Sequence, residues 1–92
     1  MRILAVCGMG FGSSMVLRMT IEAVLQEAGI QGSVATSDIG SAKSEAADVI
    51  VTSAEFEELL KSREVPIVTV KNYVDKEEMK EKLLPVLKEK ED

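Results

Sequence analysis

The residues best suited to chemistry lie together near the start of the 92-residue chain, in the segment Cys7-Gly8-Met9-Gly10-Phe11-Gly12-Ser13-Ser14. The segment joins the only cysteine of the sequence to three glycines and two serines. Glycines let the backbone turn sharply and aim successive N–H groups into one concavity that binds an anion. If a helix follows at once, its positive end favours both a bound phosphate and a thiolate.

We therefore predict that Cys7 is a catalytic nucleophile. The predicted phosphate-binding residues are Gly8, Met9, Gly10, Phe11, Gly12, Ser13 and Ser14. Two plainer interpretations stay open: Cys7 is a buried structural thiol, and Ser13 or Ser14 only caps the helix.

Three known motifs do not fit the segment. A Walker A loop needs Gly-Lys followed by Ser or Thr, but here Gly12 is followed directly by Ser13 and the lysine is missing. The dinucleotide fingerprint needs a third glycine where Ser13 stands. Thioredoxin chemistry needs a second cysteine at position 10, which is Gly10.

A cysteine phosphatase of the Cys-x5-Arg type is a closer alternative. Its arginine, which would clamp the transferring phosphoryl group, is replaced by Ser13. Its catalytic Asp-Pro pair is also absent, because Val65 precedes Pro66 and Leu84 precedes Pro85. A phosphorylated Cys7 is therefore predicted to persist, as in a phosphoryl relay.

Strands and helices alternate along the chain. Short apolar or β-branched runs predict strands at 3–6, 32–37, 49–51 and 67–70. Leu17, Ile21, Val24 and Ala28 share one helical face, and Gly29 follows as a stop signal. Further helices are predicted near 56–60 and from Asp75 onward, with a loop or short helix at 40–47.

This alternation predicts an α/β fold. We expect a single domain spanning residues 1–92, a Rossmann-like three-layer sandwich whose mostly parallel four-stranded sheet has helices on both faces. The phosphate-binding loop follows the first strand, at the carboxyl edge where such folds bind ligands.

Composition limits the partners. A net charge of −5 and 3% aromatic residues argue against nucleic-acid binding. One cysteine and no histidine exclude an internal disulfide and a His/Cys zinc site, and we predict no metal or cofactor. The apolar start is too short for a signal peptide, so we expect a cytoplasmic protein. The sequence has no heptad seam, so we expect a monomer.

The segment from Ile3 to Met15 resembles the phosphorylation loop of enzyme IIB proteins of the bacterial phosphoenolpyruvate:sugar phosphotransferase system. It is most similar to the ascorbate type, with a loop of the form Cys-Gly-x-Gly-x-Gly-Ser-Ser, and lactose- or galactitol-type relatives also fit. The resemblance implies a phosphotransferase subunit in sugar transport. Cys7 would accept phosphate from a phosphohistidine of the IIA component and pass it to a sugar held by the membrane IIC component.

Two other classes remain as alternatives: a cysteine phosphatase or arsenate-reductase-like enzyme, and an anion-binding module without catalysis. The sequence leaves the sugar open, because the resemblance assigns substrate choice to IIC.

Overall fold

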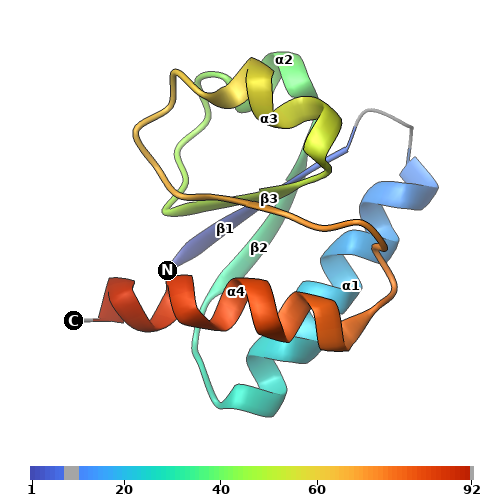
Figure 1. Ribbon diagram of the computed structural model, residues 1–92, viewed down its shortest axis with the longest axis vertical. Coiled ribbons are helices and arrows are strands. Elements are labelled where there is room, and N and C mark those ends of the chain that lie inside the picture. Colours follow the sequence, from blue (N-terminus) through green and yellow to red (C-terminus); the bar gives the residue numbers. More distant parts are fainter. Residues whose placement is uncertain (8–10, 92) are drawn as a thin grey trace.

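The computed structural model describes residues 1–7 and 11–91, without the side chains of residues 11–13, 90 and 91. Strands and helices alternate in the order β1 (Arg2–Val6), α1 (Phe11–Ala28), β2 (Ser33–Ser37), α2 (Ile39–Ala42), β3 (Val49–Thr52), α3 (Ala54–Leu60), β4 (Ile67–Thr69) and α4 (Lys76–Glu91). The predicted order is confirmed, and the strand bounds differ from those predicted by one residue (Figure 1).

The strands form one sheet in the order β2-β1-β3-β4, and all three pairings are parallel. Leu4 of the central strand β1 is in register with Ala35 of β2 and with Ile50 of β3. Parallel neighbours need a crossover between them, and the helices α1, α2 and α3 provide these connections. The predicted α/β fold with a four-stranded parallel sheet is confirmed.

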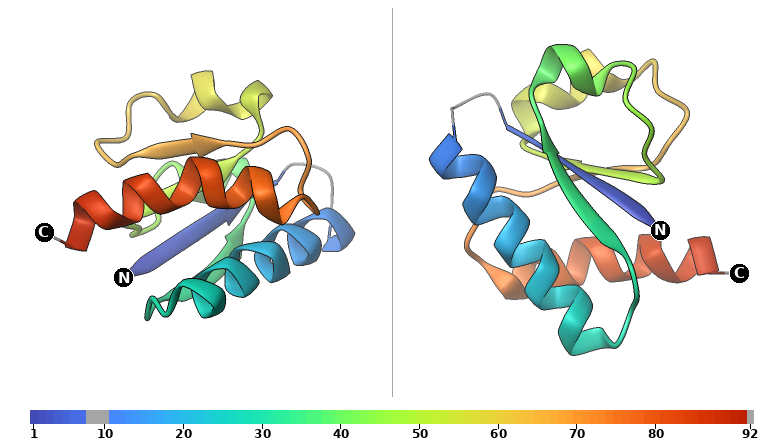
Figure 2. Two further views of the ribbon diagram at one scale, coloured as in Figure 1. Left: turned by 60° about the horizontal axis from the view of Figure 1, so that its bottom comes forward. Right: turned by 180° about the vertical axis from the view of Figure 1, so that it is seen from behind.

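Helices cover both faces of the sheet, as the views in Figure 2 show. On one face α1 and α4 pack against the sheet in a cluster that includes Ile3, Leu17, Ile21, Val51, Met79 and Leu83. On the other face the smaller cluster is Leu4, Val6, Ala42, Ile50 and Leu60, from β1, β3, α2 and α3. The three-layer sandwich is therefore confirmed.

Strand β1 is buried on both faces. Ile3 and Ala5 belong to the larger cluster, while Leu4 and Val6 belong to the smaller one, because successive side chains of a strand point to opposite faces. All four side chains are fully buried. The continuous apolar run of this strand, in place of an apolar–polar alternation, follows from that double burial.

The predicted end of the first helix is also confirmed. α1 ends at Ala28, and Gly29 adopts a φ of 70°, which favours glycine because a side chain there would be strained. The Ile30 amide then donates to the Leu25 carbonyl at 3.0 Å, which closes the last turn before β2.

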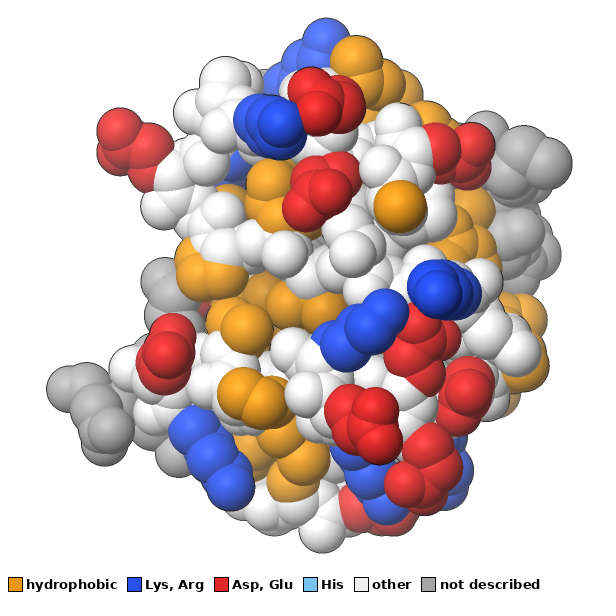
Figure 3. All heavy atoms as spheres, in the orientation of Figure 1, with side chains coloured by type: hydrophobic (Ala, Val, Ile, Leu, Met, Phe, Trp, Pro, Cys, Tyr) orange, Lys and Arg blue, Asp and Glu red, His pale blue; other side chains and the backbone are white. Residues whose placement is uncertain are grey.

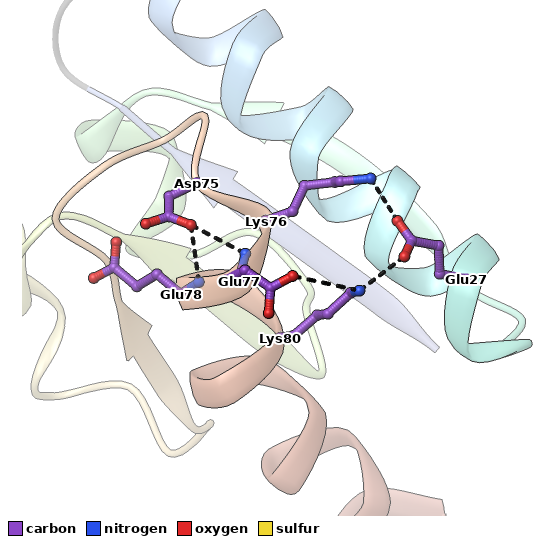
Figure 4. A network of polar contacts seen from close by, with 6 residues as sticks. All are labelled: Glu27, Asp75, Lys76, Glu77, Glu78 and Lys80. Carbon is purple, nitrogen blue, oxygen red and sulfur yellow. Dashed lines mark hydrogen bonds and ion pairs between the residues drawn. The ribbon is translucent and has the colours of Figure 1, made fainter.

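An ion-pair cluster joins the outer surfaces of α1 and α4 (Figure 4). Glu27 of α1 accepts from Lys76 Nζ at 2.7 Å and from Lys80 Nζ at 2.8 Å, and Lys80 also lies 4.0 Å from Glu77. Acidic and basic side chains intermingle over the part of the surface formed by these two helices (Figure 3). Hydrogen bonds from Lys76 and Lys80 lower the Glu27 pKa to about 2.

This cluster predicts an acid-dependent loss of stability. The folded-state pKa of Glu27 lies below its ordinary value of 4.5, so its contribution is complete above about pH 4.5 and declines as the pH falls toward about 2. Urea unfolding of Glu27→Gln measured across this range is expected to show a shallower loss of stability than the wild type. Glu57→Gln, at an exposed position of α3, is the matched control and should keep the wild-type slope. Identical slopes for the two variants would contradict the prediction.

Candidate functional site

The site lies at the carboxyl edge of the sheet. From β1 the chain crosses to β2 on one side, and β3 pairs with β1 on the other side, so the strand order reverses beside β1. In parallel α/β sheets this switch point is where ligands bind. Cys7 follows β1 directly and therefore lies at that point.

The Cys7 side chain is almost fully buried, with 4% of its surface exposed. Its backbone N–H donates to the carbonyl of Ser37 at the end of β2, at 3.4 Å. The thiol is not part of a disulfide. Cys7 is thus held by the ends of the two neighbouring strands β1 and β2.

The rest of the predicted loop is described only in part. Gly8, Met9 and Gly10 lie outside the described residues, so their predicted role in phosphate binding stays a prediction. The backbone from Phe11 onward is already helical. Ser13 and Ser14 therefore stand in the first turn of α1, and the interpretation of either as the N-cap residue is wrong.

The first turn of α1 suits an anion. The first N–H groups of a helix have no partner within it, and the backbone dipoles of an 18-residue helix add positive potential at this end. No acidic residue lies in this turn to oppose an anion. The buried side chains of Leu17, Ile21 and Val24 fix α1 on the sheet, and so fix the direction in which its first turn points.

Thr52 fixes the strand end that carries Cys7. Its side chain is fully buried at the end of β3, and its Oγ1 donates to the Val6 carbonyl at 3.0 Å. The hydroxyl thus links β3 to the residue just before Cys7.

Thr52→Val tests this link. The substitution keeps the shape of the side chain but removes the donor to the Val6 carbonyl, which is expected to lower the free energy of unfolding by about 1–2 kcal/mol. Chemical denaturation measures this difference. Thr69→Val makes the same change at a half-buried position at the end of β4 and should cost less. Equal costs at both positions would contradict a specific role for Thr52.

Tyr73 lies beyond β3 at the same edge of the sheet, and sequence reasoning missed it. It lies in the loop between β4 and α4, half-buried against the larger core cluster. Burial raises the Tyr73 pKa most, while the nearby Ser53 side chain lowers it and the nearby Cys7 side chain raises it. The available signal was the position of the only tyrosine just after a strand, at the edge that also bears Cys7.

Glu78 holds the loop that carries Tyr73. Its carboxylate accepts from the backbone N–H groups of Lys71 at 2.8 Å and Asn72 at 3.0 Å, and from Lys82 Nζ at 2.7 Å. These three bonds, with that from Lys82 the largest cause, lower the Glu78 pKa to about 2.

The spacing of Asp75 and Glu78 predicts a reciprocal capping box, which is only half correct. Asp75 Oδ1 does accept from the Glu77 and Glu78 amides. The Glu78 carboxylate binds the preceding loop in place of the Asp75 amide, which donates to the Asn72 carbonyl at 3.2 Å. The backbone N–H groups of Lys71 and Asn72 in this loop therefore donate to Glu78 in place of the Asp75 N–H group.

Two polar residues near the site have structural roles. Asp38 is the N-cap of α2 and accepts from the Ser41 amide at 2.7 Å. Arg18 pairs with Glu22 at 3.4 Å, as the i, i+4 spacing predicts.

The described residues bring the Cys7 thiol, the Thr52 hydroxyl and the first turn of a long helix to one edge of the sheet. Within residues 1–7 and 11–91, no cluster of three His, Cys, Asp or Glu side chains could hold a metal ion. In the same part of the chain no helix is long and apolar enough to cross a membrane. The chemistry that this arrangement suits is attack by the Cys7 sulfur on an anionic group bound at the start of α1.

Comparison with known proteins points to one family. A family model described as "PTS system, Lactose/Cellobiose specific IIB subunit" matches residues 2–84. The chain is 37% identical over 91 residues to the "Ascorbate-specific PTS system EIIB component" of Escherichia coli O157:H7, covering 96% of this chain and 90% of that protein. It is 38% identical over 90 residues to the protein of the same name from Shigella sonnei, covering 95% and 89% of the two chains. The Salmonella typhimurium protein of that name is 37% identical over 91 residues, again with 96% and 90% covered.

Proposed function

Since the chain belongs to the family of phosphotransferase-system IIB subunits, we propose that Cys7 is its phosphoryl carrier. In this proposal Cys7 accepts phosphate from a phosphohistidine of a IIA component and passes it to a sugar bound by a membrane IIC component. Residues 1–92 act as one IIB unit in the cytoplasm. The observation that carries the proposal is the position of Cys7, at the switch point of the sheet and before the first turn of α1.

The chemistry of the edge supports a carrier. Cys7 is the only thiol of the chain, and the sequence has no histidine, so the imidazole that donates phosphate must come from a partner. The N–H groups at the start of α1 would bind the phosphoryl oxygens, together with the amides and hydroxyls of residues 8–14.

The surface beside the site supports a transient partner. Met15 and Met19 lie one turn apart in the first half of α1, with 60% and 63% of their surfaces exposed. Flexible, polarisable methionine side chains adapt to different partner surfaces. A carrier must meet both a donor and an acceptor at the same thiol, and we propose that both dock across this part of α1.

We propose an ascorbate-like sugar as the final acceptor, because the similar proteins from three bacteria are named ascorbate-specific. The family description names lactose and cellobiose, and these are the competing acceptors. Membranes containing IIC components of each type, supplied with the phosphorylated protein, would distinguish the sugars by the phosphorylated product. Transfer to lactose or cellobiose alone would overturn this assignment.

The carrier role itself is tested with a phosphorylated IIA protein of the ascorbate type. Intact-mass spectrometry is expected to show one added phosphoryl group, and peptide mapping should place it on Cys7. Phosphate on another residue, or none, would overturn the proposal.

A further inference from the structure

The peptide group between Val6 and Cys7 is held from both sides, at the edge of the sheet where the proposed chemistry takes place. Its carbonyl, that of Val6, accepts from the Thr52 hydroxyl of β3 at 3.0 Å. Its N–H, that of Cys7, donates to the Ser37 carbonyl of β2 at 3.4 Å. Because a peptide group is planar, two bonds in opposite directions fix the orientation of its plane. That orientation determines where the Cys7 side chain starts.

The bond from Thr52 is the stronger of these two restraints. Its length of 3.0 Å is within the usual range for hydrogen bonds, whereas the 3.4 Å bond to Ser37 is longer than usual. β3 is an interior strand between β1 and β4, whereas β2 lies at the edge of the sheet. The backbone of Thr52 is itself fixed, because its carbonyl accepts from the Val70 N–H at 3.0 Å. Loss of the Thr52 hydroxyl would remove the shorter bond and leave the longer one.

Packing alone does not account for a threonine at this position. The preceding residues of β3, Val49–Val51, are apolar, and all four side chains of the strand are fully buried. A valine would fill the same space without the cost of burying a hydroxyl. The pairing of β1 with β3 runs as far as Ala5 and Val51, and the Thr52 side chain extends this link toward Cys7.

We propose that Thr52 is a positioning residue for phosphoryl transfer. Its hydroxyl holds the Val6–Cys7 peptide group in the orientation that lets the Cys7 sulfur attack a phosphoryl group at the start of α1. This inference rests on the proposed carrier function. Thr52 acts through the backbone and not on the reacting atoms.

The transfer depends on direction as well as on distance. The sulfur forms an S–P bond, the P–N bond of the donor phosphohistidine breaks with its electron pair on the imidazole, and the imidazole takes up the thiol proton. The attacking sulfur and the departing nitrogen must lie roughly in line through the phosphorus. A misplacement of about 1 Å can cost about 10²-fold in rate. A peptide group that turns more freely would therefore slow the transfer without weakening the docking of the donor.

Thr52→Val and Thr52→Ser separate the hydroxyl from the rest of the side chain. Each variant is mixed with increasing concentrations of a phosphorylated IIA protein of the ascorbate type, at a temperature where it is fully folded. Phosphate on Cys7 is followed by intact mass. Thr52→Val should lower the rate at saturating donor by about 10- to 100-fold and leave the KM for the donor unchanged. Thr52→Ser keeps the donor to the Val6 carbonyl and should keep a rate close to that of the wild type.

Thr20→Val is the matched control. Thr20 is also a buried threonine whose hydroxyl donates to a backbone carbonyl, that of Tyr73, at 2.6 Å. Its substitution removes a comparable bond but leaves the Val6–Cys7 peptide group held as before, so the rate at saturating donor should stay at the wild-type value. If Thr20→Val slows the transfer as much as Thr52→Val does, the slower rate follows from lost stability and the inference is wrong.

Hydrogen exchange gives a second readout that needs no phosphate. The exchange rate of the Cys7 N–H is compared with that of the Leu4 N–H in the same protein, which reports global unfolding. The ratio of the two rates should rise in Thr52→Val and stay near the wild-type value in Thr52→Ser and Thr20→Val. An unchanged ratio in Thr52→Val would overturn the inference.

The outcomes separate this inference from the carrier function. If wild-type Cys7 takes up phosphate and Thr52→Val does so at the wild-type rate, only the role of Thr52 is wrong. The same holds if Thr52→Ser is as slow as Thr52→Val. If wild-type Cys7 takes up no phosphate, the carrier function is wrong and the inference falls with it.

Discussion

Cys7→Ser is expected to fold as the wild type does and to accept no measurable phosphate from a phosphorylated IIA protein. A serine hydroxyl is a weak nucleophile unless a neighbouring base activates it, whereas a cysteine is a few per cent thiolate even at its ordinary acidity. The sequence contains no histidine that could serve as such a base. The rate of acceptance, followed by intact mass, is expected to fall by at least about 10³-fold.

Folding of this variant is checked separately. The side chain at position 7 is almost fully buried, but oxygen is smaller than sulfur, and the backbone bond to Ser37 does not involve the side chain. Circular dichroism and urea unfolding should therefore show a folded protein. A folded Cys7→Ser protein that still accepts phosphate would mean that another residue is the carrier.

Wild-type protein is expected to hydrolyse aryl phosphates at a negligible rate, which distinguishes a carrier from a cysteine phosphatase. The arginine that would stabilise the transferring phosphoryl group is replaced by Ser13. Loss of such a preorganised stabiliser costs about 10²–10³ in rate, and a missing general acid costs about another 10²–10⁴. Release of a chromogenic aryl alcohol measures the turnover.

Ser13→Arg should improve the binding of aryl phosphates and restore turnover only in part, because the loop aspartic acid is still absent. Many turnovers per second by the wild-type protein would instead identify a phosphatase and overturn the carrier function.

The fold could be predicted from the sequence because its signals are local. The apolar run Ile3 to Val6 indicates a strand buried on both faces, and Leu17, Ile21 and Val24 indicate one face of a helix. The start of the first helix is less clearly marked in the sequence. α1 begins at Phe11, before the serines that seemed suitable caps, because the chain is already helical at the end of the glycine-rich segment.

The site could be predicted only where it is continuous in sequence. Cys7 and the glycines after it form one recognisable segment, whereas Tyr73 lies far along the chain, and only the strand order brings it to the same edge. Glu78 shows the same limit. Its spacing from Asp75 indicates a local capping box, but loop amides that approach in three dimensions are its actual partners.

Strand β1, which precedes Cys7, and the loop that carries Tyr73 should differ in how easily they open locally. β1 pairs with strands on both sides and its residues Ile3 to Val6 are fully buried, so the amides of Leu4 and Ala5 should exchange with solvent deuterium only when the whole protein unfolds. The Tyr73 loop is tied down by Glu78 and Thr20 and belongs to no strand. Cys7 therefore follows a strand whose amides should be strongly protected, whereas the amides of the Tyr73 loop should exchange through local fluctuations. Local opening of this loop would leave β1, and with it the position of Cys7, undisturbed.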